Sequence, residues 1–256
     1  MTEAEWSTAT VPATMLEFLE NKTSERKLRL FACSCCRGVW HRLRAESLRT
    51  AVKVSEKFAD GDAAASELET ASGFAWRTKY QIEEAEIDFT NVAEAEAANA
   101  FFHAAEAAAQ TAGSPFDDET PYIFRTIDVA RSTSFVFSSD VVEAALSSGS
   151  GYASRDEERA ASESARKAEE IKQAHFLRDV VGNPFRPVTF DSSWLTSTVS
   201  ALAAGIYTES AFDRLPILAD ALQDAGCDNE DILTHFRSDG PHVKGCWALD
   251  LVLGKA

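Results

Sequence analysis

Residues 83–112 read EEAEIDFTNVAEAEAANAFFHAAEAAAQTA, and this stretch decides the fold class. Most of it is Ala and Glu, which favour a helix and specify little else. We therefore expect a long helical stretch over residues 62–110, with a break near Gly73. A stripe of mostly small residues, spaced by fours and threes, suits close contact between helices. Its members are Phe89, Ala93, Ala97, Ala100, Ala104 and Ala108.

The segments on both sides also read as helices, because apolar residues recur with helical period and Pro, Gly or capping residues mark the ends. Asp228, with Asp231 three residues later, is the expected N-cap of one late helix. No strand alternation stands out. The sequence therefore predicts an all-α protein, a multi-helix bundle with long central helices and a C-terminal cluster of short helices. The other expected helices cover residues 12–21, 24–44, 46–59, 121–146, 154–181, 193–207, 213–225, 228–237 and 241–253.

Residues 182–256 differ in composition from the Ala and Glu stretch. Prolines, glycines and aromatic residues stand at irregular places, as in residues 182–188 (GNPFRPV). Such residues specify a particular backbone, since Pro fixes φ and Gly permits tight turns. We expect this block to form the defined surface of the protein and the middle of the chain to form scaffold.

The bulk composition is that of a globular protein. The chain has 256 residues, of which 45% are hydrophobic and 10% aromatic. No apolar run approaches the ~20 residues of a membrane helix, and the acidic start lacks the apolar core of a secretion signal. Five cysteines, three of them at positions 33, 35 and 36, do not resemble a secreted disulfide framework. We expect a cytoplasmic protein with reduced thiols.

Charge is unevenly distributed along the chain. The net charge is −16, but residues 22–57 contain ten Lys or Arg against three Glu. This basic segment could bind an anion or a nucleic acid, or it could pack near acidic helices or be solvated. Because the rest of the chain repels a polyanion at long range, we do not expect a nucleic-acid partner.

Two pairs of residues carry metal-ligand chemistry. Cys33 and Cys36 are three apart in one expected helix, and His242 and Cys246 are four apart in the last one, so each pair shares a face. Together they could form a tetrahedral Cys3His zinc site that ties the two helices together. The alternative is that the cysteines, Cys35 included, are small buried packing residues. No cofactor is otherwise expected, and a structural zinc stays an open alternative.

A nucleophilic thiol is the other chemistry that these residues suggest. His242, Cys246 and Asp250 could present base, nucleophile and acid on one helical face. Productive triads usually draw on separate elements, and the apolar residues after Cys246 indicate burial, which quiets a thiol. No phosphate-binding loop, dinucleotide fingerprint or nucleophile elbow is present. We predict no catalytic residue.

Two arginines are candidates for ligand or partner contact. Arg186 lies between two prolines, so its guanidinium is presented by a stiff backbone. Arg214 follows Asp213 at the start of another expected helix. The alternative for both is an internal salt bridge or a role in capping carbonyls.

Four segments resemble a family of bacterial proteins that has no established activity. They are residues 27–37 (KLRLFACSCCR), 182–188 (GNPFRPV), 211–222 (AFDRLPILADAL) and 245–255 (GCWALDLVLGK). The resemblance covers about the first 60 and last 75 residues, and it implies no site residue. It does imply that residues 1–61 and 182–256 form one helical unit, with residues 62–181 as a long-helix insertion. A single domain over residues 1–256 is the alternative.

The function most consistent with these observations is a non-enzymatic helical interaction or scaffold module, with a protein partner or self-association. The main alternative is a zinc-stapled structural or regulatory module. A third is an enzyme with an unrecognised helical site. Metal content separates the first two, and a deep pocket containing Arg186 would favour the third.

Overall fold

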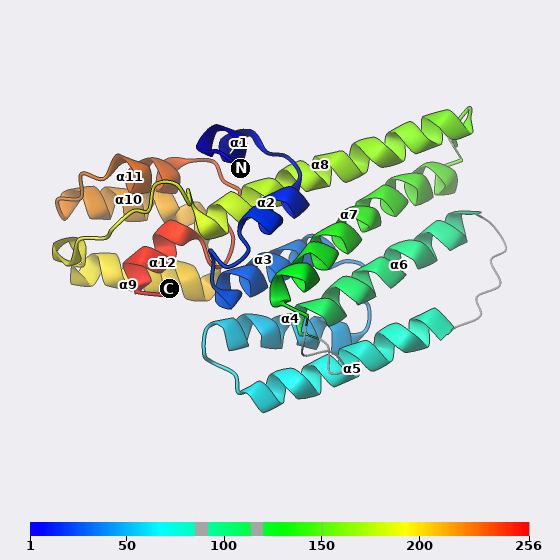
Figure 1. Cartoon of the computed structure of the whole chain (residues 1–256), viewed down its shortest axis with the longest axis horizontal. Helices are drawn as coiled ribbons and strands as arrows, with labels where there is room; N and C mark the ends of the chain where they lie inside the picture. The colour runs from blue at the N-terminus through cyan, green and yellow to red at the C-terminus, as the bar shows by residue number, and fades with distance from the viewer. Residues whose placement is uncertain (85–91, 114–119, 150, 256) are drawn as a thin grey trace. The chain divides into compact units, whose positions relative to one another are not determined.

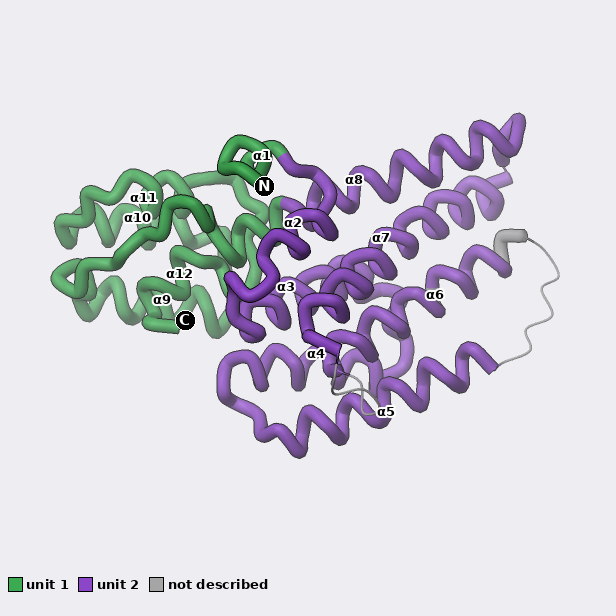
Figure 2. The backbone as a smooth tube through the Cα atoms, viewed as in Figure 1, with its two compact units in different colours: residues 1–8, 175–256 green, residues 9–174 purple. Residues whose placement is uncertain are grey.

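The computed structural model describes residues 1–84, 92–113, 120–149 and 151–255 (Figure 1). These residues form twelve α-helices and two short 3-10 helices, with no strand, so the all-α prediction is confirmed. The chain divides into two compact units (Figure 2). Unit 1 contains residues 1–8 and 175–256, and unit 2 contains residues 9–174. Of the N-terminal part that we expected to join residues 182–256, only residues 1–8 cluster with the C-terminal part.

Unit 2 is a bundle in which α6 (Val92–Thr111) packs along α7 (Tyr122–Ser147). Helix α3 (Glu25–Gly38) packs against α7 and α4 (Glu46–Ala59), and α4 also packs against α6. Ser24 begins α3 by accepting a hydrogen bond from the Lys27 amide, the expected role of an N-cap serine. The helices of this unit are α2 (Pro12–Phe18), α3 (Glu25–Gly38), α4 (Glu46–Ala59), α5 (Ala65–Glu84), α6 (Val92–Thr111), α7 (Tyr122–Ser147) and the first part of α8 (Arg155–Val181).

The alanines of α6 do form a contact face. Ala100, Ala104 and Ala108 are fully buried, and the close approach of α6 to α7 uses their small size. Phe89, at the start of the predicted stripe, lies outside the described residues. The predicted break near Gly73 is wrong, because α5 continues through that residue.

The C-terminal end of α6 is fixed by side chains from three other helices. The Thr111 carbonyl accepts hydrogen bonds from Arg29 Nη1 at 3.1 Å, Ser55 Oγ at 3.3 Å and Tyr122 Oη at 2.6 Å. The last carbonyls of a helix lack partners within it and carry partial negative charge. A buried guanidinium and two hydroxyls satisfy that need here, so this polar centre is complete without a ligand.

Five of the ten cationic side chains in the basic segment, residues 22–57, form ion pairs within unit 2. Three of these five pair with the segment's own glutamates, and Arg26 and Arg42 pair with carboxylates outside it, which supports in part the interpretation that these helices pack near acidic groups. The pairs are Arg26–Asp60, Arg29–Glu25, Arg37–Glu56, Arg42 with Asp140 and Glu143, and Lys53–Glu46.

Unit 1 is built from short helices around an apolar core. The core includes Ile206, Leu215, Leu218, Phe236 and Leu249, which are all buried. The elements are α1 (Glu3–Thr8), α8 from residue 175 onward, the 3-10 helices η1 (Ser192–Trp194) and η2 (Phe212–Arg214), α9 (Ser197–Glu209), α10 (Leu215–Asp224), α11 (Glu230–Arg237) and α12 (Trp247–Leu253).

Several predicted boundaries in unit 1 are wrong, and those of the last two helices bear on the site. The helix expected from residue 241 begins only at Trp247, because Gly245 has a φ of +90° that a helix cannot contain. The N-cap of α11 is Asn229 and not Asp228, since Asn229 Oδ1 accepts the Ile232 amide at 3.1 Å. Among the described helices, none combines the length and the apolar character that crossing a membrane requires.

Candidate metal centre

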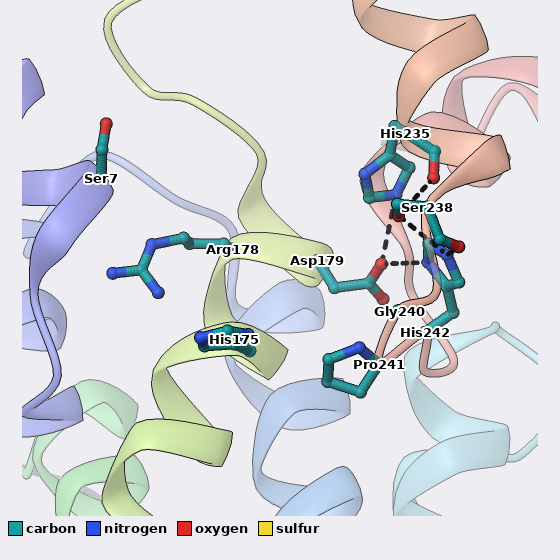
Figure 3. Close-up of a pocket in the computed structure, with 9 residues that line it drawn as sticks. All are labelled: Ser7, His175, Arg178, Asp179, His235, Ser238, Gly240, Pro241 and His242. Atoms are coloured by element: carbon teal, nitrogen blue, oxygen red, sulfur yellow. Dashed lines mark hydrogen bonds and ion pairs between the residues drawn. The ribbon is translucent and has the colours of Figure 1, made fainter.

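Four side chains of unit 1 converge in one place: Asp179, His235, His242 and Cys246. One ligand atom from each lies within 4.8 Å of the others. Figure 3 shows Asp179, His235 and His242 pointing toward one another. We call these four residues the Asp179 group.

Separate segments of unit 1 bring the group together. Asp179 lies in the last turn of α8 and His235 near the end of α11, and Cys246 directly precedes α12. His242 lies in the loop between α11 and α12. Gly240 in that loop has a φ of +85°, and a Cβ at this position would be 2.8 Å from the His242 amide nitrogen. Only glycine therefore allows the turn that presents His242.

His242 and the loop backbone hold both oxygens of Asp179. His242 Nδ1 lies 2.8 Å from Asp179 Oδ1, and the Val243 amide donates to Oδ2 at 2.8 Å. The other ring nitrogen of His242, Nε2, lies 3.3 Å from the Ser238 carbonyl oxygen. The Ser238 hydroxyl lies 3.4 Å from the same nitrogen and itself donates to the His235 carbonyl at 2.8 Å. Both Ser238 oxygens can therefore accept a proton from Nε2. The His242 ring is therefore oriented from both sides.

His235 links the carboxylate to the thiol. Its Nε2 lies 3.2 Å from Asp179 Oδ1 and 3.0 Å from Cys246 Sγ. On the opposite side of the ring, Trp247 Nε1 donates to His235 Nδ1 at 3.3 Å. The backbone of Gly182 packs against the indole of Trp247. Its φ is +77°, and a Cβ there would lie 3.0 Å from Trp247 Cγ, so a larger residue would displace the ring.

The group is buried and charged. The side chain of Asp179 is 3% exposed, and Cys246 is fully buried. Burial acts to raise the pKa of Asp179, but the hydrogen bonds from His235 and His242 outweigh it and lower that pKa. Burial acts to lower the pKa of His242, but the hydrogen bond to Asp179 and its charge outweigh it and raise that pKa. The site therefore keeps an ionised carboxylate away from bulk water.

A cleft of about 250 Å³ opens beside the group. Its lining includes Asp179, His235 and His242, together with His175 and Arg178 (Figure 3). Arg178 lies at the other end of the cleft, where its Nε and Nη2 donate to the Trp6 carbonyl at 3.0 and 2.9 Å. The cleft wall thus combines three of the convergent residues with a cationic side chain.

Two of the four residues predicted to bind zinc belong to this group, namely His242 and Cys246. Cys33 and Cys36 lie in unit 2, where Cys33 Sγ is 3.8 Å from the Val52 carbonyl and Cys36 Sγ is 3.2 Å from Thr111 Oγ1. Burial raises the pKa of Cys36 to about 12, so its sulfur is a thiol at neutral pH. A ligand role for these two cysteines stays a prediction.

Asp179 and His235 are absent from the predicted site. His235 lies seven residues before His242, and Asp179 follows Arg178 and precedes Val180 at the end of a charged helix. Nothing in this local sequence separates Asp179 from the other acids of the helix. The predicted face of His242, Cys246 and Asp250 does not form as expected, because only Asp250 lies within α12.

Both arginines predicted to contact a ligand form ion pairs within unit 1. Arg186 Nε lies 2.6 Å from Glu3 Oε1, and Arg214 Nη1 lies 2.9 Å from Glu209 Oε2. Asn183 Nδ2 also donates to Glu3 Oε1, at 2.8 Å. These are the internal salt bridges that the sequence left open as an alternative.

A comparison of the chain with family models, curated proteins and solved structures found no match. What the Asp179 group can bind is therefore argued from its own donor atoms. They comprise a carboxylate oxygen, two imidazole nitrogens and a sulfur, and such a group could hold a metal ion.

Proposed function

We propose that unit 1 is a zinc-binding module and that the Asp179 group holds the ion. The observation that carries this proposal is the convergence of four ligand atoms within 4.8 Å, from segments that are far apart in the sequence. Imidazole and thiolate ligands favour zinc over the hard cations calcium and magnesium, which take oxygen ligands.

The hydrogen bonds around His242 support a ligand role for its Nδ1. With the single proton of a neutral ring on Nε2, facing the Ser238 carbonyl, Nδ1 offers a lone pair to the interior of the group. A backbone carbonyl behind a metal-bound histidine is a common outer-shell arrangement. Without a cation, the lone pair of Nδ1 would face the Asp179 oxygen at 2.8 Å. A metal ion removes this repulsion, as does a second proton on the ring.

A zinc ion at this place would cross-link α8, the loop that contains His242 and the start of α12. Metal binding to such a site contributes directly to folding free energy, because the unfolded chain has no preformed site. A structural or regulatory zinc corresponds to the zinc-stapled module, the main alternative to the interaction module expected from the sequence, with a different set of ligands. Complete burial of Cys246 further argues against a nucleophile, since a substrate would need access to the sulfur.

Elemental analysis of protein purified without chelator or affinity metal tests the proposal, with a parallel titration of thiols in the folded protein. We expect about one zinc per chain. Cys246→Ser and His242→Ala should lose the metal. Cys33→Ser and Cys36→Ser are matched controls that should retain it, and loss of zinc in these two variants would instead assign the site to unit 2. Absence of zinc from the wild type, even after loading, would contradict the proposal and leave an Asp179–His242 ion pair.

A further inference from the structure

We infer that His235 donates a hydrogen bond beside the zinc ion and does not bind it, so that the fourth coordination position opens to the cleft and takes a small anion. This inference rests on the proposed zinc binding and specifies it. Asp179, His242 and Cys246 then supply the three protein ligands. Three protein ligands and one exchangeable position are typical of zinc sites that bind a small molecule, whereas structural sites are closed by four.

The partners of the two imidazoles distinguish their roles. Behind His242 stands an acceptor, the Ser238 carbonyl, which favours a ring proton on Nε2. The other nitrogen, Nδ1, lies 2.8 Å from Asp179 Oδ1 and can exchange a proton at that place for the metal ion. Behind His235 stands the indole N–H of Trp247, which can only donate. His235 Nδ1 must therefore accept, and the single proton of the neutral ring lies on Nε2. A protonated nitrogen has no lone pair for a metal ion.

The proton on His235 Nε2 has two acceptors within the group. Asp179 Oδ1 and Cys246 Sγ lie 3.2 and 3.0 Å away. Hydrogen bonds of this kind orient metal ligands and tune their basicity. His235 also belongs to the cleft wall, and its side chain is 18% exposed. A ligand that enters the cleft from solvent can therefore reach this side chain.

Charge and size indicate which ligand the open position takes. The Asp179 carboxylate and a Cys246 thiolate neutralise the two charges of zinc, and Arg178 adds a positive charge to the cleft wall. Arg178 and the His235 N–H both favour an anion. A volume of about 250 Å³ is below the usual range for drug-sized ligands, so the ligand class is a small inorganic anion or a short carboxylate.

Cobalt substitution makes the open position visible. Co²⁺ replaces zinc with similar geometry and gives a thiolate charge-transfer band and visible d–d bands. We would titrate the cobalt protein with azide at constant ionic strength. An open position predicts saturable changes in the d–d bands while the thiolate band persists. If the thiolate band is present but azide does not change the d–d bands, the site is closed by four protein ligands. That result would overturn the inference and leave the proposed zinc binding intact.

Two variants test the role of Trp247 and His235. Trp247→Phe removes the indole donor, so the His235 proton can move to Nδ1 and Nε2 can close the site. We expect at least about a tenfold loss of azide affinity with cobalt still bound. His235→Ala should keep cobalt and respond to azide, because the three ligands remain. Loss of cobalt binding in a folded His235→Ala variant would show that His235 is a ligand. Absence of a thiolate band in every variant would overturn the zinc proposal and this inference with it.

Discussion

The Thr111 carbonyl in unit 2 and the Asp179 group in unit 1 are both buried polar centres, but they differ in the balance of donors and acceptors. At Thr111 one acceptor meets three side-chain donors. In the Asp179 group, a carboxylate, a sulfur and two imidazoles bring four potential ligand atoms to one point. An acceptor that is fully satisfied by donors is structural, whereas convergent ligand atoms can also hold a cation.

The comparison also separates two kinds of burial. Arg29 is 4% exposed and lies over the rings of Phe58 and Tyr122, so the charge in unit 2 is a cation held by acceptors. Asp179 is 3% exposed, and the charge in unit 1 is an anion. An added metal ion suits only the second of these.

The largest expected effect comes from removing the metal. An ion present at about 1,000 times its Kd contributes about 4 kcal/mol, which corresponds to roughly 20 °C in the melting temperature of a unit of about 90 residues. We expect excess chelator to raise hydrogen exchange in α9 and α12 and to leave α6 and α7 protected. Equal loss of protection in both sets of helices would break the comparison.

Arg29→Leu should give the next largest effect, now in unit 2. The change removes a charged hydrogen bond to the Thr111 carbonyl and should cost about 2 kcal/mol. Urea unfolding followed by exchange of α6 peptides measures it. The milder Tyr122→Phe removes one neutral donor and should cost about 1 kcal/mol. Metal content should be unchanged in both variants, and loss of zinc from either would contradict independent roles for the two centres.

Glu169 in unit 2 tests what a buried acceptor without a hydrogen-bond donor costs in stability. It is 4% exposed, and its Oε1 has no hydrogen-bond partner among the described residues. Burial raises its pKa above the ordinary value of 4.5, so ionisation costs more in the folded state than in the unfolded state. We expect Glu169→Gln to stabilise unit 2 by about 1 kcal/mol at pH 7. The gain should vanish well below pH 4.5, where wild-type Glu169 is protonated in both the folded and the unfolded state. A gain that is independent of pH would show that ionisation is not its cause.

Arg186→Ala should have the smallest effect. Its ion pair with Glu3 is exposed, with 67% of the Arg186 side chain accessible, so its loss should cost less than about 0.5 kcal/mol. Thermal melting of the variant measures this change. A cost of several kcal/mol would mean that this exposed ion pair stabilises the protein as much as a buried polar centre does, which would contradict the comparison.

Helical class and several boundaries could be predicted because they depend on local chemistry. Residues 46–59 form a helix with the predicted bounds. Ala100, Ala104 and Ala108 of the predicted stripe are buried, as are other alanines of α6 that lie off the stripe. The serine-rich part of α7 is also helical, as predicted, although serine has modest helix propensity. Packing against α6 supports α7 where local propensity is weak.

The candidate site could be predicted only in part, because its members meet through long-range contacts. His242 and Cys246 were found through an assumed helical spacing that the structure does not have. Asp179 contacts His242 from 63 positions away, and in sequence it is one acid among many on a charged helix. Local pattern identifies ligand types, but only the tertiary fold brings the carboxylate to the imidazoles.

The position of Trp247 gives unit 1 a built-in optical reporter. Its indole ring lies 5.0 Å from the His235 ring, at the edge of the Asp179 group. An open-shell ion such as Co²⁺ or Cu²⁺ at that distance quenches indole fluorescence, whereas Zn²⁺ does not. Trp247 is one of five tryptophans in the chain. The difference in emission between the wild type and Trp247→Phe therefore isolates the signal of Trp247. Displacement of cobalt by zinc could then be followed in real time as recovery of that emission.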